Sequence, residues 1–354
     1  MQQAQHARGW NFLPKLTFVI TIGLITAATG FQARAVDVFT DPVGFITLTA
    51  QGTTSSGLSF LGLGMTQIPT LRGVLTAASG KQLTLNSVLT NGQFSGGPLG
   101  PLFFIEVTSG PLTGLLDDIV SNDTANVYTA NSDGLAGTEN FKIYPHWTLS
   151  SVFGPNAESG LKKGTATTAD QILVFNPMNQ SYLAYFFSSG GAIGAGWRLG
   201  GGGSTDYSTE RLYIDQGILI QKKTSTNLTI QLVGAVKLGQ TIEYIGPTNN
   251  FVANVYASGT MTLSNSMLYN GGNVTNSLVG GTATTADQVL IHDDVGGGYS
   301  SYFWSNGGAI GAGWREGGQG ATDESGTLIP LGATLLIERK APRAGFNWFA
   351  PAPY

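Results

Sequence analysis

Two short segments carry a tryptophan, an arginine and two aspartates at the same spacing. The first set is Trp197, Arg198, Asp170 and Asp206, and the second, 117 residues further on, is Trp314, Arg315, Asp287 and Asp323. A tryptophan ring can stack on a sugar, a guanidinium is a planar donor, and carboxylates hold hydroxyl groups or calcium. The pattern therefore suggests a speculative sugar-stacking or calcium-dependent site in each copy.

The same residues also have a structural interpretation, which we favour over the first. Trp197 and Trp314 would close the end of a β core, Asp170 and Asp287 would cap turns, and each arginine would pair with an aspartate. Aromatic side chains on strands more often pack in a core or across strands than bind a ligand. Solvent exposure of the two tryptophans distinguishes the two interpretations.

A phosphate-binding loop is excluded at these turns. Gly190–Arg198 and its copy Gly307–Arg315 both read GGAIGAGWR, which spaces the glycines as G-x-x-G-x-G and not as the dinucleotide fingerprint G-x-G-x-x-G. The glycine-rich run Leu199–Asp206 cannot open a helix whose N-terminus would hold a phosphate.

Other groups suited to catalysis are sparse. His146 and His292 are the only histidines after the first 35 residues, so a histidine cluster for zinc cannot form, and no G-x-S-x-G motif occurs. The pairs Asp117–Asp118 and Asp293–Asp294 are adjacent in sequence, and neighbours on a strand point to opposite faces. We expect no cofactor and lean towards a protein that is not an enzyme, with a secreted hydrolase as a lesser alternative.

The N-terminus has the pattern of a secretory signal peptide. Arg8 and Lys15 precede the apolar stretch Leu16–Gly30, and Ala33-Arg34-Ala35 is an A-x-A cleavage site. A retained membrane anchor would need about 20 apolar residues. We therefore predict a signal peptide over residues 1–35, cleavage between Ala35 and Val36, and a mature protein that is secreted, periplasmic or on the cell surface.

The composition of the mature chain excludes some classes of partner and of site. It has 14 basic and 21 acidic residues, a formal charge of −7, with the basic residues scattered, so nucleic acid is excluded as a partner. No segment after the leader approaches a membrane-spanning run, and with no cysteine the chain has neither disulfides nor thiolate metal sites. An outer-membrane barrel is disfavoured because prolines interrupt Phe349–Tyr354.

Short strands are expected almost everywhere after the leader, with no significant helix. β-Branched and aromatic runs end at Gly, Asn, Pro or Ser and favour an all-β fold of sandwich or barrel-like lobes. These runs are Gly44–Ala50, Lys81–Leu89, Leu102–Val107, Thr124–Ala130, Asn140–Trp147, Ser181–Ser189, Asn227–Val236 and Gln240–Gly246.

An internal repeat predicts how the lobes are built. Gly164–Arg198 and Gly281–Arg315 share 22 of 35 residues, and a fainter echo relates Ile68–Leu89 to Gly246–Leu268. We expect a duplicated two-part unit, A-B-A′-B′, with A lengthened by an insertion between about Leu89 and Trp147. The expected boundaries are 36–150 for A, 151–223 for B, 224–272 for A′, 273–340 for B′ and 341–354 for a C-terminal tail.

Several segments resemble a known family. Thr40–Leu48 (TDPVGFITL) just after the leader, Tyr144–Gly154 (YPHWTLSSVFG), and the TADQILVFN, SYLAYFF and Gly-Trp-Arg segments are similar to a secreted paralogous family of uncharacterised proteins from verrucomicrobial bacteria. The resemblance implies export and a β-rich fold, and it carries over no catalytic residues. The repeated B unit departs from that family's pattern.

These observations favour an exported, non-enzymatic, β-rich protein that acts as a structural, adhesive or interaction module at the cell envelope or outside. The expected partners are polysaccharides or envelope proteins. The alternative is a carbohydrate-binding module that uses the repeated Gly-Trp-Arg turns.

Overall fold

Strands form nearly all of the regular structure, as the alternating pattern predicted. The computed structural model describes residues 41–272, 275–340 and 343–354, so the expected signal peptide and the Ala35–Val36 bond lie outside the described residues. Within the described ranges the helical segments are α1 (Leu149–Phe153) and the 3₁₀ turns η1 (Gly191–Ile193) and η2 (Gly308–Ile310). The prediction of an all-β fold is confirmed.

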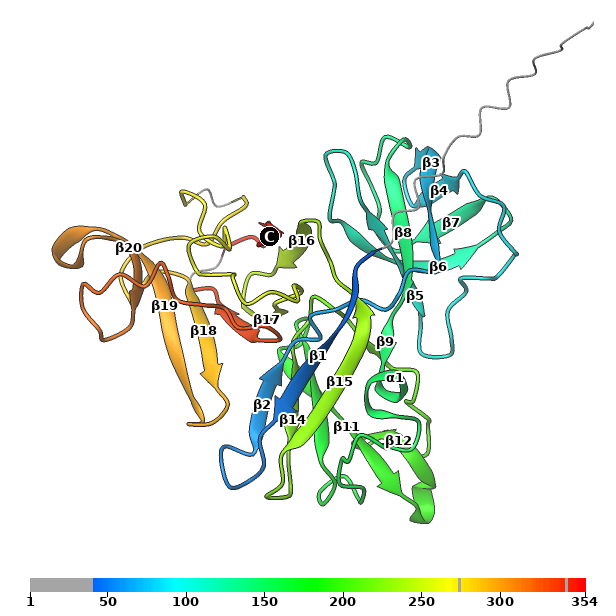
Figure 1. Cartoon of the computed structure of the whole chain (residues 1–354), viewed down its shortest axis with the longest axis horizontal. Helices are drawn as coiled ribbons and strands as arrows, with labels where there is room; N and C mark the ends of the chain where they lie inside the picture. The colour runs from blue at the N-terminus through cyan, green and yellow to red at the C-terminus, as the bar shows by residue number, and fades with distance from the viewer. Residues whose placement is uncertain (1–40, 273–274, 341–342) are drawn as a thin grey trace, which may run out of the picture. The chain divides into compact units, whose positions relative to one another are not determined.

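Six strands close into a barrel, in the order β3-β4-β7-β6-β5-β8 (Figure 1). They are β3 (Leu71–Ser79), β4 (Gln82–Leu85), β5 (Phe103–Val107), β6 (Leu116–Asn122), β7 (Asn126–Thr129) and β8 (Asn140–Pro145). Alternate residues such as Leu83, Ile105 and Val127 are fully buried in its interior. Register shifts after Leu75 and after Ile119 supply the bends that a small closed barrel needs.

A five-stranded antiparallel sheet forms what we call the first lobe, in the order β12-β11-β10-β14-β2. Its strands are β2 (Leu58–Leu61), β10 (Gln171–Asn176), β11 (Ser181–Ser189), β12 (Ala195–Leu199) and β14 (Ile218–Gln221). The lobe also contains the helix α1 and two strand pairs. One pair joins β1 (Val43–Ala50) to β15 (Leu228–Ala235), and the other joins β9 (Trp147–Thr148) to β13 (Arg211–Leu212).

A second five-stranded sheet, ordered β17-β21-β18-β19-β20, forms the second lobe. Its strands are β17 (Asn249–Ala253), β18 (Gln288–Asp293), β19 (Gly298–Asn306), β20 (Ala312–Glu316) and β21 (Thr334–Glu338). The strand pair here joins β16 (Thr241–Ile245) to β22 (Phe346–Ala350). The expected C-terminal tail 341–354 therefore contains a paired strand, which corrects that boundary.

The two lobes make corresponding contacts at equivalent positions. Each lobe has a turn that begins at a threonine. Thr148 Oγ1 accepts a hydrogen bond from the N–H of Ser151 in the first lobe, and Thr262 Oγ1 accepts one from the N–H of Asn265 in the second. In the strands, the pairing of β14 with β2 through Leu219 and Phe60 corresponds to that of β21 with β17 through Leu336 and Phe251.

The faint echo in the sequence does not correspond to a shared structure. Ile68–Leu89 contains the β3–β4 hairpin of the barrel, whereas Gly246–Leu268 contains β17 followed by turns. The strand that takes the place of β17 in the first lobe is β2, which precedes the echo. The insertion thus starts earlier than expected and comprises the whole barrel. The echo was misleading because the hydrophobic pattern of a hairpin strand is similar in any antiparallel sheet.

Separate hydrophobic clusters stabilise the barrel and each lobe, and a further cluster lies between the lobes. Between the lobes, Phe60 and Phe251 stack with ring centroids 5.9 Å apart. Phe175 packs on Phe251 and its equivalent His292 packs on Phe60, at 4.7 and 4.4 Å. In the part of the chain that the structure describes, no helix has the length and apolar character that crossing a membrane requires.

Candidate functional site

The repeated tryptophans are core residues. Trp197 is 0% exposed and Trp314 is 1% exposed, and the indole N–H of Trp197 donates to the carbonyl of Gly154 at 3.1 Å. Because neither ring has a free face, neither can stack on a sugar. The sugar-stacking hypothesis for these turns is therefore wrong, and the structural interpretation holds.

The repeated arginines fasten their own turns. Arg198 donates from Nε, Nη1 and Nη2 to the carbonyls of Ile193, Trp197 and Ala195 at 2.8–2.9 Å. Arg315 makes the same three bonds to Ile310, Trp314 and Ala312. Asp206 and Asp323 lie 3.7 and 3.5 Å from these guanidinium groups, but their side chains are 62% and 68% exposed, so each ion pair contributes little.

The two remaining aspartates of the set are buried and neutralised within the protein. Asp170 accepts from Lys222 Nζ and from the backbone N–H of Lys162 and Lys223. Asp287 accepts from Arg339 Nε at 2.9 Å and from Arg343 Nη1 at 3.0 Å. With these cations in place, calcium binding at the turns lacks the two buried carboxylates that it would need.

A different set of residues surrounds two adjoining cavities of about 230 and 530 Å³, which we call together the acidic cleft. The cavities share Asn131, Tyr213 and Asp215. The first is also lined by Phe104, Leu116, Asp117, Asp118, His146 and Ile214, and the second by Phe175, Pro177, Gln216, Glu243, Tyr244, Asn250, Phe251 and Val252.

The barrel and both lobes contribute to this cleft. Asp117 and Asp118 lie on β6, and His146 links β8 to β9. Asp215 follows β13 in the first lobe, and Glu243 lies on β16 in the second. The N–H of Ile242 donates to the carbonyl of Gly114 at 2.9 Å, which fastens β16 beside the start of β6.

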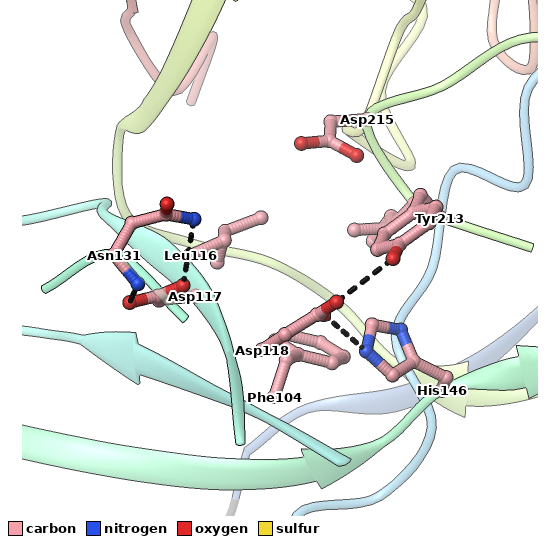
Figure 2. A pocket seen from close by; sticks show the side chains of 9 residues that line it. Phe104, Leu116, Asp117, Asp118, Asn131, His146, Tyr213 and Asp215 are labelled. Carbon is pink, nitrogen blue, oxygen red and sulfur yellow. Dashed lines mark hydrogen bonds and ion pairs between the residues drawn. The ribbon is translucent and has the colours of Figure 1, made fainter. Parts of the chain in front are cut away.

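Asp118 is held by two side chains of the cleft, His146 and Tyr213 (Figure 2). Its Oδ1 lies 2.8 Å from His146 Nε2, and its Oδ2 accepts from the hydroxyl of Tyr213 at 2.8 Å. Burial alone would raise the pKa of Asp118, but the contacts with His146 and Tyr213 and the charge of Arg211 hold it below 3.8. Asp118 is therefore ionised at neutral pH.

Asp117 is satisfied separately from its neighbour. Its carboxylate accepts from the N–H and the side-chain amide of Asn131, at 2.9 and 3.3 Å (Figure 2). It also accepts from the hydroxyl of Ser132 at 2.5 Å. Asp117 and Asp118 line one cavity but have different partners, which agrees with the expectation that adjacent aspartates do not form an acid–base couple.

Asp215 and Glu243 have the opposite environment. Neither carboxyl group accepts a hydrogen bond from another side chain in the described ranges, and Glu243 is only 8% exposed. Burial raises the pKa of Asp215, and burial together with the charge of Asp215 raises the pKa of Glu243 well above 4.5. Figure 2 shows Asp215 without a bond to any residue drawn.

The cleft can therefore present an ionised carboxylate, Asp118, beside two carboxyl groups whose pKa values are raised. No three His, Asp or Glu side chains in the described part of the chain lie close enough together to hold a metal ion. In the same part, the described hydrogen bonds of the two histidine rings are to Asp118 and Asp294, and no serine hydroxyl bonds to either ring.

Asp118, Tyr213, Asp215 and Glu243 were not predicted as site residues from the sequence, and His146 was not connected to them. The run TIEYI does not mark Glu243, because Ile242 and Tyr244 alternate with Thr241 and Glu243 and so predict Glu243 on the exposed face. In the structure Glu243 is buried and Tyr244 is exposed. The other residues come from separate elements, and only the tertiary fold brings them together.

Comparisons with known proteins do not assign this site. No family model matches the chain, and comparisons with the curated proteins and with solved structures found no match. The resemblance to a secreted verrucomicrobial family therefore stays a prediction.

Proposed function

We propose that this protein is exported and acts at the cell envelope or outside as a non-catalytic binding module, and that the acidic cleft is its binding site. The observation that carries the proposal is Glu243, a residue that lines the cleft, is only 8% exposed, and has no side-chain partner in the described ranges. Burying an unpaired carboxyl group costs free energy, and proteins keep such groups mainly at functional sites. The leader pattern at residues 1–35 supports export.

The binding claim is tested by capture from a solubilised envelope fraction containing both polysaccharide and protein. The bait is the chain from Val36, either native or carrying Asp215→Asn and Glu243→Gln. Asp206→Asn with Asp323→Asn is the matched control, because it likewise replaces two carboxyl groups by amides, but at exposed positions. We expect the cleft variant alone to lose capture, and equal capture by all three baits would refute the cleft as the binding site.

The export claim has its own test. Expression of the whole chain in a Gram-negative host, followed by fractionation and N-terminal sequencing, should yield a protein outside the cytoplasm that begins at Val36. An uncleaved chain in the cytoplasm would contradict export.

A second candidate is a secreted hydrolase, favoured by the opposite pKa shifts of Asp118 and Glu243. Glycosidases use two carboxyl groups whose pKa values are set apart by their environments. A screen of glycosidase and esterase substrates with the purified chain, repeated with Glu243→Gln, tests this candidate. Turnover that Glu243→Gln abolishes would support it over the binding module, and no turnover on any substrate would count against it.

A further inference from the structure

The charges of the acidic cleft are unbalanced. Among the described residues, four carboxyl groups line its two cavities and no lysine or arginine does. The neighbouring basic side chains already contact other groups, and Lys237 and Arg211 do not line the cavities. His146 contacts Asp118, Lys237 bonds to Glu106, and Arg211 lies over the ring of Tyr213. A ligand that brings positive charge would therefore complement this cleft.

Two of the four carboxyl groups are free to take such a ligand. Asp117 and Asp118 accept hydrogen bonds from neighbouring side chains, whereas Asp215 and Glu243 accept none from another side chain among the described residues. Asp215 and Glu243 both line the larger of the two cavities, and the negative charge of Asp215 disfavours ionisation of Glu243. A cation between them would convert this repulsion into two attractions.

The residues around the pair favour an organic cation over a metal ion. The described His, Asp and Glu side chains form no group of three that could hold a metal. An ammonium group carries three donors, which suits two carboxylates and one amide or carbonyl oxygen. Asn250 and Gln216 line the same cavity, and the aromatic rings of Tyr213 and Phe251 can contact the alkyl chain behind the ammonium.

We propose that the acidic cleft binds the ammonium group of a primary amine, such as a lysine side chain or a diamine, between the carboxylates of Asp215 and Glu243. This inference rests on the proposed function and names the ligand class for the same site. Binding requires both carboxylates to be ionised, so a proton held by the pair leaves to solvent as the ammonium enters. Asp118 and His146 from the barrel, and Lys237 after β15, are the other charged or titratable groups that act on Asp215.

Isothermal titration calorimetry with 1,5-diaminopentane tests the proposal directly. The titration is carried out at about pH 7 in phosphate and in MOPS, which contain no primary amine and whose ionisation enthalpies differ, so that the heat reports the protons released. We expect saturable binding with net proton release, and an affinity that falls as the pH is lowered, because protons then compete with the ammonium. Binding without proton release, or binding that strengthens at lower pH, would overturn the proposal.

Variants separate the cleft from general charge effects. Glu243→Gln and Asp215→Asn should each weaken diamine binding by about tenfold or more, whereas Asp206→Asn with Asp323→Asn should leave it unchanged. Urea unfolding of Glu243→Gln should show no loss of stability, so weaker binding would not reflect misfolding. Equal weakening by the exposed-site control, or calcium chloride binding with the same dependence on Asp215 and Glu243, would refute an ammonium-specific site.

The experiment also distinguishes the ligand class from the proposed function. If the diamine does not bind but capture from the envelope fraction still depends on Asp215 and Glu243, the binding module stands and the amine is wrong. If neither measurement depends on the two carboxyl groups, both proposals fail.

Discussion

At the scale of single residues, the chain has two kinds of buried polar side chain. Some bond to other groups of the protein and stabilise the fold, and others have no side-chain partner. The conspicuous residues of the repeat belong to the first kind. Arg198 fastens its turn through three carbonyls, and Asp170 is neutralised by Lys222. Asp215 and Glu243 belong to the second kind, because no other side chain bonds to them in the described ranges. An absence of partners thus identifies the site better than a conspicuous residue type does.

Replacing Trp197 with alanine should destabilise the first lobe without affecting the cleft. Trp197 is fully buried against Phe153 and Phe187, so its removal leaves a cavity and should cost about 3–5 kcal/mol in the free energy of unfolding. Urea denaturation measures the loss. A variant as stable as the native chain would contradict the burial of this ring.

Glu243→Gln should stabilise the protein in a pH-dependent way. The pKa of Glu243 is raised in the folded state, so ionisation opposes folding once the pH exceeds the ordinary value of 4.5. The free energy of unfolding should be clearly higher than that of the native chain near pH 8 and nearly equal to it near pH 4. Urea titrations at both pH values provide the measurement, and a loss of stability near pH 8 would indicate that Glu243 has a partner.

At the scale of elements, the lobes hold each other through reciprocal contacts. The N–H of Gly62 donates to the carbonyl of Gly332, and the N–H of Ala253 donates to that of Asp215. The isolated β-bridges Leu61–Ala333 and Gln216–Val252 likewise join a segment of the first lobe to a segment of the second. Since Asp215 lies within these contacts, the pairing of the lobes fixes the position of a cleft residue.

Gly217→Ala should disturb this pairing. A Cβ at Gly217 would overlap the side chain of Thr334 on the other lobe, so the substitution should cost about 1–3 kcal/mol through overpacking. Gly239→Ala is the matched control, because nothing lies within 4 Å of a Cβ there and its backbone needs no positive φ. Thermal unfolding of both variants tests the contact, and equal melting temperatures would contradict it.

The sequence predicted the strands better than their assembly. The aromatic run that ends at Gly190 predicted β11 at Ser181–Ser189 with its correct ends, because aromatic residues favour strands and glycine ends them. The strand is not half-buried along its length, since both of its faces are buried in its second half. Alternation could not tell a hairpin of the barrel from a strand of a lobe, so Ile68–Leu89 was matched to the wrong element. The cleft is formed by β6, β16 and the segment after β13, and no local sequence pattern predicts that these three segments lie together.

At the scale of the whole molecule, carboxyl groups with opposite pKa shifts should set the pH dependence of stability. The pKa of Asp118 is lowered, so its contribution to stability is present above the ordinary value of 3.8 and is lost as the pH falls. The pKa values of Asp215 and Glu243 are raised, so stability is lost as the pH rises through them.

The free energy of unfolding should therefore be greatest in the mildly acidic range and decline on both sides. Urea denaturation between about pH 3 and pH 9 measures this curve. The double variant Asp215→Asn with Glu243→Gln should flatten the alkaline side and leave the acidic side unchanged. A native curve that rises steadily to pH 9 would contradict the assignment of the raised pKa values.

The most direct test of the acidic cleft as a binding site is the titration of the Glu243 carboxyl group, followed by ¹³C NMR in a chain labelled at glutamate and assigned with Glu243→Gln. In the free protein this carboxyl should titrate well above 4.5, because it is buried without a partner and lies near the charge of Asp215. Saturating 1,5-diaminopentane should lower that pKa, because the ammonium stabilises the ionised form. A carboxyl group that titrates near 4.5 with and without the diamine would contradict both the unpaired state of Glu243 and the role of the cleft.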